Sequence, residues 1–171
     1  MFLLFIGNFD LTPLHFAALK GYFEICELII NNVDDKNPAT FKDKWGSQGI
    51  TPLHNAAKNG HFEICQLIIN NVEDKNPEST YDYEWTPLHK AAENGHFQVC
   101  QLIVNNLEDK NPMAGEENLT PLHFASKNGH LEICQLILEN VEEKDPKDNL
   151  GRTPFEYAHS NNHLEVAKLF V

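Results

Sequence analysis

The sequence TPLHNAAKNGHFEICQLIINNV, residues 51–72, decides the fold, because it recurs along the chain with small changes. Its opening phrase, Thr-Pro-Leu-His, occurs intact at Thr12–His15, Thr51–His54, Thr86–His89 and Thr120–His123. A fifth copy begins at Thr153 and carries Phe and Glu in its last two places. Successive copies begin 39, 35, 34 and 33 residues apart. A period in this range indicates a protein of stacked repeats.

The opening phrase has the composition of a helix start. Thr51 is a good N-cap, because its hydroxyl can accept a backbone N–H that lacks a helical partner. The proline that follows is favoured at the first helical position, where its missing N–H costs nothing. Leu53, Ala56 and Ala57 then fall at helical spacing, and Gly60 stands where a left-handed residue ends the segment. The pattern predicts a helix of about two turns in each copy.

A longer amphipathic helix is predicted after the glycine. Ile64, Leu67, Ile68 and Val72 form one apolar stripe at helical spacing, so the helix is expected to reach Val72. A polar loop leads from there to the next copy, and each loop contains a proline that prevents the helix from resuming. These prolines stand in the pairs Asn37-Pro38, Asn76-Pro77, Asn111-Pro112 and Asp145-Pro146.

Each loop also opens with two acidic residues and a lysine. In the second copy these are Glu73, Asp74 and Lys75. A charge that repeats in this way indicates a solvated edge, with the lysine expected to neutralise the carboxylates. The alternative is a negative stripe for a basic partner.

The unit Thr-Pro-Leu-His-x-Ala-Ala-x-x-Gly-His, followed by Ile-Cys-x-Leu-Ile, resembles the ankyrin repeat. The resemblance implies an all-α solenoid of stacked antiparallel helix pairs, whose projecting loops help to form a concave surface. It also implies that the phrase histidines bridge backbone groups of successive loops. The predicted repeats are 12–50, 51–85, 86–119, 120–152 and a truncated 153–171, with 1–11 as a remnant of a preceding repeat or an N-terminal cap.

The two ends of the chain lack the polar outer faces that terminal repeats usually need. Residues 4–9 align with residues 28–33, the tail of a second helix, and residues 169–171 are apolar. This pattern suggests the hypothesis that the chain is a segment of a longer array with further ankyrin repeats.

Charge and composition exclude several classes of partner. The formal net charge is −12, with 13 basic and 25 acidic residues, whereas a nucleic-acid-binding protein needs a basic surface. The same charge would repel an anionic membrane surface. The chain has no stretch that fits a spanning helix, and its apolar first residues lack the features of a signal peptide. We therefore expect a soluble, intracellular protein of the cytoplasm that binds neither nucleic acid nor membrane.

Cysteine and histidine follow the repeat and do not form a chemical site. The four cysteines occupy one repeat position, where the fifth copy has Ala167, which indicates a small buried apolar site. No histidine has a partner at zinc-ligand spacing, and neither a Gly-x-Ser-x-Gly motif nor a phosphate-binding loop occurs. The sequence therefore predicts no catalytic, cofactor-binding or metal-ligating residue, and no enzyme.

The function class that remains is the binding of another protein through a surface. In the family that the chain resembles, partners bind the loops and the exposed positions of the first helix, and aromatic residues in loops are common anchors of protein contacts. We therefore predict a scaffold that binds another protein. The alternatives are a targeting segment of a larger enzyme or channel, and a structural spacer. The predicted partner-binding residues are Phe16, Phe41, Trp45, Asn55, Lys58, Tyr81, Tyr83, Trp85, Lys90, Glu93, Phe124, Lys127 and Tyr157.

Overall fold

The computed structural model describes residues 11–40, 49–79 and 85–171. Within these ranges the chain forms ten α-helices and one 3₁₀-helix and no extended strand. The elements are α1 (Pro13–Lys20), α2 (Phe23–Ile30), α3 (Pro52–Lys58), α4 (Phe62–Ile69), α5 (Pro87–Glu93), α6 (Phe97–Val104), α7 (Pro121–Asn128), α8 (Leu131–Asn140), α9 (Pro154–Ser160), α10 (Leu164–Ala167) and η1 (Lys168–Phe170).

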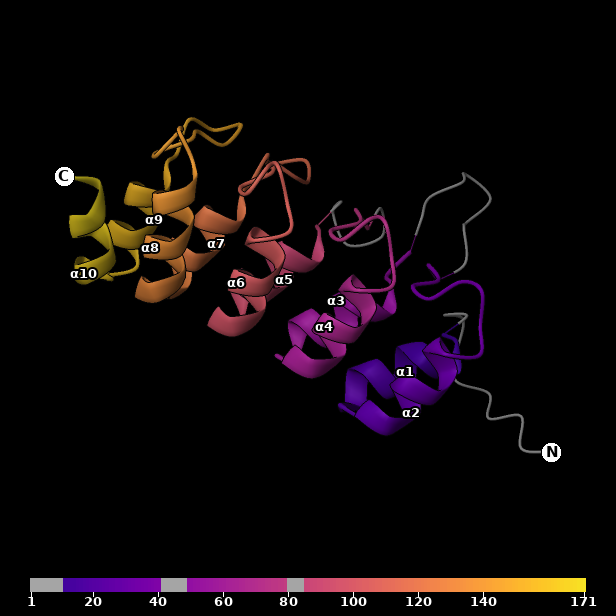
Figure 1. Ribbon diagram of the computed structural model, residues 1–171. Helices are drawn as coiled ribbons and strands as arrows, with labels where there is room; N and C mark the ends of the chain where they lie inside the picture. The colour runs from indigo at the N-terminus through magenta and orange to yellow at the C-terminus, as the bar shows by residue number, and fades with distance from the viewer. Residues whose placement is uncertain (1–10, 41–48, 80–84) are drawn as a thin grey trace.

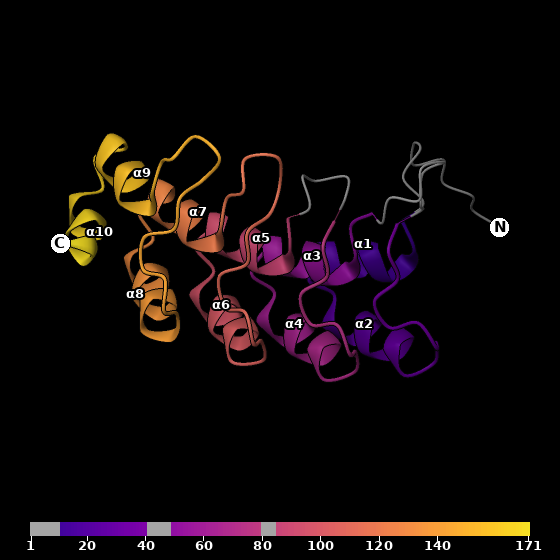
Figure 2. The same cartoon turned by 90° about the horizontal axis from the view of Figure 1, so that it is seen from above.

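The helices form pairs that stack side by side along one axis (Figure 1). The first helices pack in order, α1 on α3, α3 on α5, α5 on α7 and α7 on α9, and the second helices do the same. Figure 2 shows the two rows, with the loops before α7 and before α9 extending beyond the row of first helices. The predicted all-α solenoid of stacked helix pairs is confirmed.

Each first helix starts with a reciprocal cap between the first and last residues of the phrase. In α3 the Thr51 hydroxyl accepts the His54 N–H at 3.4 Å, and the His54 ring accepts the Thr51 N–H at 3.2 Å. The fifth copy keeps this cap, because a carboxylate oxygen of Glu156 accepts the Thr153 N–H at 2.9 Å. Glu at this position is the usual partner in a capping box, so the altered phrase still starts a helix.

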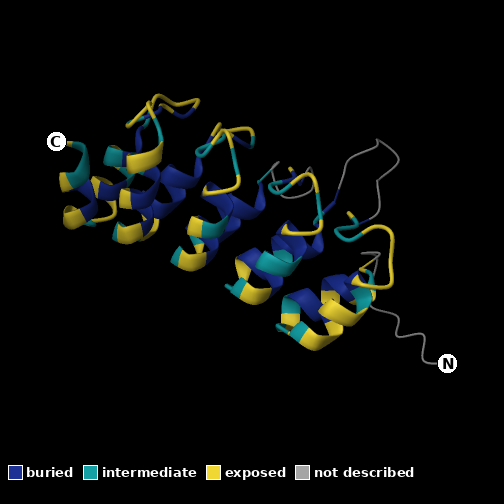
Figure 3. Cartoon of the chain, viewed as in Figure 1, coloured by how far each residue is buried: buried dark blue, intermediate teal, exposed yellow. Residues whose placement is uncertain are grey.

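The core lies between the two rows of helices (Figure 3). It takes small residues from the first helices, such as Ala56 and Ala57, and branched residues from the second helices, such as Ile68. Alanine on the packed face lets neighbouring helices approach closely. The cysteine position is a buried apolar site, as predicted, and it is filled by Cys26, Cys65, Cys100, Cys134 and Ala167.

Most of the second helices end earlier than predicted. The helix α4 ends at Ile69, and Val72 lies beyond it, only partly buried. The reason is a polar cap, since the side-chain amide of Asn71 donates to the Leu67 carbonyl at 2.9 Å. That carbonyl belongs to the last turn, where helix carbonyls lack a backbone partner. The prediction that the helix reaches Val72 rested on the spacing of apolar residues, which does not reveal this cap.

Two of the loop lysines make contacts that the sequence did not predict. The ammonium group of Lys110 donates to the Val104 carbonyl at 3.0 Å, at the end of α6, and Lys144 donates to the Leu138 carbonyl of α8. A cation at a helix C-terminus satisfies free carbonyls and complements the helix dipole. Lys110 and Lys144 therefore cap helices, a role that the charge pattern alone did not predict.

Candidate interaction surface

A histidine from each intact phrase ties its repeat to the loop that follows. His89 is fully buried on α5, and its Nε2 donates to the Leu119 carbonyl at 3.0 Å while its Nδ1 accepts the Thr86 N–H at 3.2 Å. Equivalent Nε2 bonds join His15 to Ile50, His54 to Trp85 and His123 to Arg152, at 2.8, 3.0 and 3.3 Å. The bridging role that the resemblance implied is confirmed.

These bonds require neutral imidazoles. Burial lowers the pKa of His89 to about 4, although its hydrogen bond to Leu119 acts in the opposite direction. Burial also lowers the pKa of His15 and of His123. A ring that accepts a backbone N–H on one nitrogen and donates from the other must carry a single proton. At neutral pH the loops are therefore held by uncharged rings.

The two loops that are described throughout their length, before α7 and before α9, project from the stack as narrow hairpins. Ala114 and Leu119 exchange two backbone hydrogen bonds, of 2.9 and 3.0 Å. A single backbone hydrogen bond of 2.9 Å joins the Thr40 N–H to the Ile50 carbonyl, and another of 2.9 Å joins the Asp148 N–H to the Arg152 carbonyl. The row of first helices, α1, α3, α5, α7 and α9, and the hairpins beside it form one surface of the molecule. We call this surface the concave face.

The predicted partner-binding residues have different exposures. Phe41, Trp45, Tyr81 and Tyr83 lie outside the described residues. Phe16, Lys58 and Lys127 are exposed, whereas Asn55, Trp85, Glu93 and Tyr157 are partly covered. Lys90 and Phe124 are buried, with exposed fractions of 5% and 4%. Of the predicted residues that the structure describes, Phe16, Lys58 and Lys127 therefore have exposed side chains.

Trp85 explains the burial of that pair. Its ring meets Phe124 edge to face, with centroids 4.6 Å apart, and the Lys90 ammonium lies 4.1 Å from the indole centroid. The Lys90 ammonium also lies 4.0 Å from a Glu93 carboxylate oxygen. Aromatic edge contacts and cation–π contacts each stabilise such a cluster. Residues that the sequence separated into a loop and two helices therefore form one cluster.

This cluster forms part of a hollow on the concave face. The hollow has a volume of about 400 Å³, and its lining residues are Trp85, Ala114, Gly115, Glu116, Glu117, Leu119, Phe124 and Lys127. The apolar part comes from the aromatic rings and Leu119, and the charged part from the hairpin tip and α7. The glutamates were not among the predicted residues, since a loop carboxylate gives no periodic signal.

A second cluster links the last two hairpins. Asp148, buried in the hairpin before α9, accepts Nε–H of Arg152 at 2.8 Å and the Tyr157 hydroxyl at 3.0 Å. Burial alone would raise the pKa of Asp148, but its hydrogen bonds, led by those from Arg152, lower it overall. Burial and the bond to Asp148 raise the pKa of Tyr157 to about 12. The Arg152 guanidinium reaches Glu117 of the previous hairpin at 3.6 Å, so the two hairpins are held in register.

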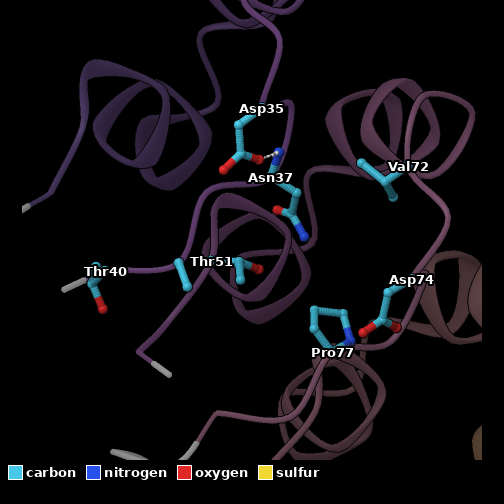
Figure 4. A pocket seen from close by; sticks show the side chains of 8 residues that line it. Asp35, Asn37, Thr40, Thr51, Val72, Asp74 and Pro77 are labelled. Carbon is cyan, nitrogen blue, oxygen red and sulfur yellow. Dashed lines mark hydrogen bonds between the residues drawn. The ribbon is translucent and has the colours of Figure 1, made fainter. Parts of the chain in front are cut away.

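A larger hollow, of about 470 Å³, lies between the first two loops (Figure 4). Its polar side chains already bind the backbone. An Asp35 carboxylate oxygen accepts the Asn37 N–H at 3.1 Å, and the Asn37 side chain accepts the Leu53 N–H at 3.0 Å. Leu53 stands in the first turn of α3, where N–H groups lack helical partners. These residues hold the frame, and the asparagine of each Asn-Pro pair acts as a helix cap that the sequence analysis missed.

The described residues hold neither a metal-type cluster nor an ionised thiol. None of their groups of three or more His, Cys, Asp or Glu side chains could hold a metal ion. Burial raises the pKa of the Cys65 thiol to about 12 and of the Cys26 and Cys134 thiols to about 11, so these thiols are protonated at neutral pH. Among these residues no helix is long and apolar enough to cross a membrane.

Fold and surface together define the class of protein, a helical-repeat solenoid whose hairpin loops stand beside a row of short first helices. The chain matches the family model for ankyrin repeats (three copies) over residues 14–114 and 106–171, and it belongs to the ankyrin repeat family. Ankyrin repeats are generally protein–protein interaction modules. No curated protein matches the chain.

Proposed function

We propose that the chain is a scaffold that binds another protein through its concave face. The proposal rests on one observation: within each repeat, some residues hold the frame and recur from copy to copy, whereas others vary. The phrase, the glycine and the Asn-Pro pair hold the frame, while the residue after the phrase changes from copy to copy. Phe16 is exposed, Asn55 and Tyr157 are partly covered, and Lys90 and Phe124 pack under Trp85 as the floor of the surface. A rigid frame that presents variable side chains loses little conformational entropy on binding.

The hollow beside Trp85 is the proposed anchor point. A concave site with an apolar wall and a few charged groups is suited to an apolar or aromatic side chain of a partner. Glu116 at its rim is exposed, and the whole chain carries a formal net charge of −12. Long-range attraction therefore favours a partner whose contacting segment is basic.

The proposal includes no catalytic activity and a reducing compartment, the cytoplasm. The phrase histidines are engaged in backbone bonds, and the buried cysteines are protonated thiols, so neither supplies a nucleophile or base. The four cysteines are free, as is typical of intracellular proteins.

Photo-crosslinking in a lysate of the source cell tests the proposed face. A photoreactive residue replaces Lys58 or Lys127 on the first helices, and in matched controls it replaces Glu63 or Glu132 on the second helices. All four side chains are exposed, so none of these changes disturbs the core. We expect one discrete adduct from the Lys58 and Lys127 positions and none from the controls.

Charge-reversal variants provide a second test of binding through the concave face. Glu116→Lys is expected to lower adduct formation from the Lys58 position about tenfold, because it places a like charge beside a basic segment, whereas Glu132→Lys on the row of second helices leaves it nearly unchanged. Helical circular dichroism should be the same for both variants. Equal labelling from both rows of helices, or no discrete adduct from either row, would reject binding through the concave face and favour a spacer.

A further inference from the structure

Two aromatic rings of the concave face bind cations of the chain itself. The Lys90 ammonium lies 4.1 Å from the centroid of the Trp85 indole, and the Arg152 guanidinium carbon lies 4.9 Å from the centroid of the Tyr157 ring. A cation over an aromatic face is attracted by the negative charge of the π-system. Cations are therefore bound on this surface by the same kind of contact in two different repeats.

The surroundings of Arg152 show which groups hold a guanidinium on the concave face. Its Nε–H donates to an Asp148 carboxylate oxygen at 2.8 Å, and one of its terminal nitrogens lies 3.6 Å from a Glu117 carboxylate oxygen. The guanidinium thus lies against one aromatic ring and between two hairpin carboxylates. Because it is planar, it can stack on a ring and bond to carboxylates at the same time, whereas an ammonium group cannot stack in this way.

The hollow beside Trp85 has an aromatic wall but no guanidinium of its own. Phe124 stands directly after the fourth phrase, as Tyr157 stands after the fifth, and Leu119 stands directly before the fourth phrase, at the position of Arg152 in the fifth. Arg152 is the single arginine of the sequence. The hollow, with its volume of about 400 Å³, is within the size range of sites that hold a ligand group.

The charged residues that line the hollow leave it negative. Glu116, Glu117 and Lys127 are all exposed, and two carboxylates against one ammonium leave a formal charge of −1. The Glu117 carboxylate is shared with Arg152, but the Glu116 carboxylate makes no hydrogen bond or ion pair with any other residue that the structure describes. A cation in the hollow would therefore find a carboxylate that is not already engaged.

The hairpin that carries both glutamates is held in place by the next hairpin. The Asn149 N–H donates to the Glu117 carbonyl at 3.0 Å, and the Asn149 side-chain amide donates to the Glu116 carbonyl. The Asn118 amide in turn donates to the Asn149 side-chain oxygen at 2.7 Å. These bonds fix the backbone beneath the carboxylates, so a cation that binds between them orders few further groups.

We infer that the hollow beside Trp85 receives an arginine side chain of the partner protein, an inference that rests on the proposed function. The apolar stem of arginine covers the aromatic wall, while its guanidinium bonds to Glu116. A single side chain thus matches both the apolar wall and the negative rim. Lysine matches the charge alone, because its ammonium is strongly hydrated and not planar. An apolar side chain matches the wall alone.

A nuclear magnetic resonance titration of the full chain with N-acetyl-arginine amide tests this inference. The chain has two tryptophans, so the Trp85 indole N–H signal can be assigned by its loss in Trp85→Phe. We expect this signal to shift and saturate with a Kd on the order of 1 mM, as is reasonable for so small a probe. The matched probes are N-acetyl-lysine amide, which should bind at least about threefold more weakly, and N-acetyl-phenylalanine amide, which should bind more weakly still.

Two variants show whether the carboxylate acts as inferred. Glu116→Gln keeps the shape of the side chain but removes its charge, and should weaken binding of the arginine probe about fivefold. Glu132→Gln, at an exposed position on α8, is the matched control and should leave binding unchanged. Four outcomes would overturn the inference: no saturable shift with the arginine probe, equal or tighter binding of the lysine probe, equal or tighter binding of the phenylalanine probe, or equal arginine binding by the two variants.

The photo-crosslinking experiment separates this inference from the proposed function. A discrete adduct from the concave face together with any of those four outcomes rejects the arginine site alone. Saturable, Glu116-dependent binding of the arginine probe without an adduct supports the arginine site and rejects only the capture of a partner protein.

Discussion

The Nε2 atom of His89 lies 3.0 Å from the carbonyl oxygen of Leu119, a residue 30 positions further along the chain. His89 is in the first turn of α5, and Leu119 closes the hairpin that leads into α7. One buried side chain therefore caps its own helix and fixes the base of the next hairpin. The position of each hairpin on the concave face depends on such a bond.

Removing the His89 imidazole should lower the free energy of unfolding. His89→Ala leaves the Thr86 N–H without its acceptor, removes one of the two hydrogen bonds to the Leu119 carbonyl and opens a cavity in a fully buried site, so we expect a loss of about 3 kcal/mol in the free energy of unfolding. His159→Ala is the control, because His159 is exposed and its ring lies beside Phe155, with centroids 5.9 Å apart. Its effect should stay within about 0.5 kcal/mol. Similar urea midpoints for the two variants would contradict the assigned role.

Stability should fall in mild acid. Unfolded histidine has a pKa of 6.5, whereas folded His89 stays neutral down to about 4. Between these values the unfolded chain binds more protons, so the free energy of unfolding decreases as the pH falls. His89 alone accounts for a loss on the order of 3 kcal/mol across this window. His15 and His123 shift in the same direction.

Urea unfolding between about pH 7.5 and about pH 4.5 measures this slope. His89→Gln removes the titrating group but keeps an N–H donor, so its stability should be lower at neutral pH and depend less on pH. A pH dependence as steep as that of the unsubstituted chain would show that other groups control acid unfolding in this range.

The Asn-Pro cap can be tested by two changes at one position. Asn111→Ala removes the acceptor of the Leu122 N–H, now bonded at 3.0 Å, and should cost about 1 kcal/mol. Asn111→Asp keeps an acceptor oxygen and should be close to neutral, since Asp145 already serves the Phe155 N–H at 3.2 Å. Chemical denaturation compares the two. An equal loss in both variants would mean that the amide group has another role.

Alanine substitutions at two glycines distinguish the cost of a left-handed backbone from the cost of a steric clash. Gly95 and Gly151 share a φ of +77°, but a Cβ on Gly95 would lie 2.7 Å from His130, whereas nothing lies within 4 Å of one on Gly151. Gly151→Ala should cost about 1 kcal/mol, the price of the left-handed backbone. Gly95→Ala should cost about 2 kcal/mol more, because the His130 ring must move. Equal thermal unfolding temperatures for the two would argue against close packing of adjacent repeats.

Local patterns in the sequence predicted most of the frame. The Thr-Pro start, the glycine stop and the buried cysteine position are each set by residues within one or two turns, so a single copy of the unit carries the information. The position of Asn162 in the fifth copy also follows, because its φ of +63° fits the left-handed site that glycine fills elsewhere.

The caps between repeats could not be predicted in this way. Asn37 caps a helix that starts 15 residues later, at Pro52, and neither residue's local pattern reveals the contact. Lys110 was paired with the nearest carboxylates in sequence, although in the folded chain its ammonium group reaches the end of α6. Both contacts depend on how a loop returns across a helix end.

The sequence by itself determined that this protein is an ankyrin-repeat solenoid, because periodic capping and packing signals act over short distances and were repeated five times. Only the tertiary structure decided which variable side chains remain available. It buried Lys90 and Phe124 under Trp85, and it left Ile25 exposed while its counterparts were covered. Exposure depends on the neighbouring repeat, and the composition of one repeat does not specify what is packed against it.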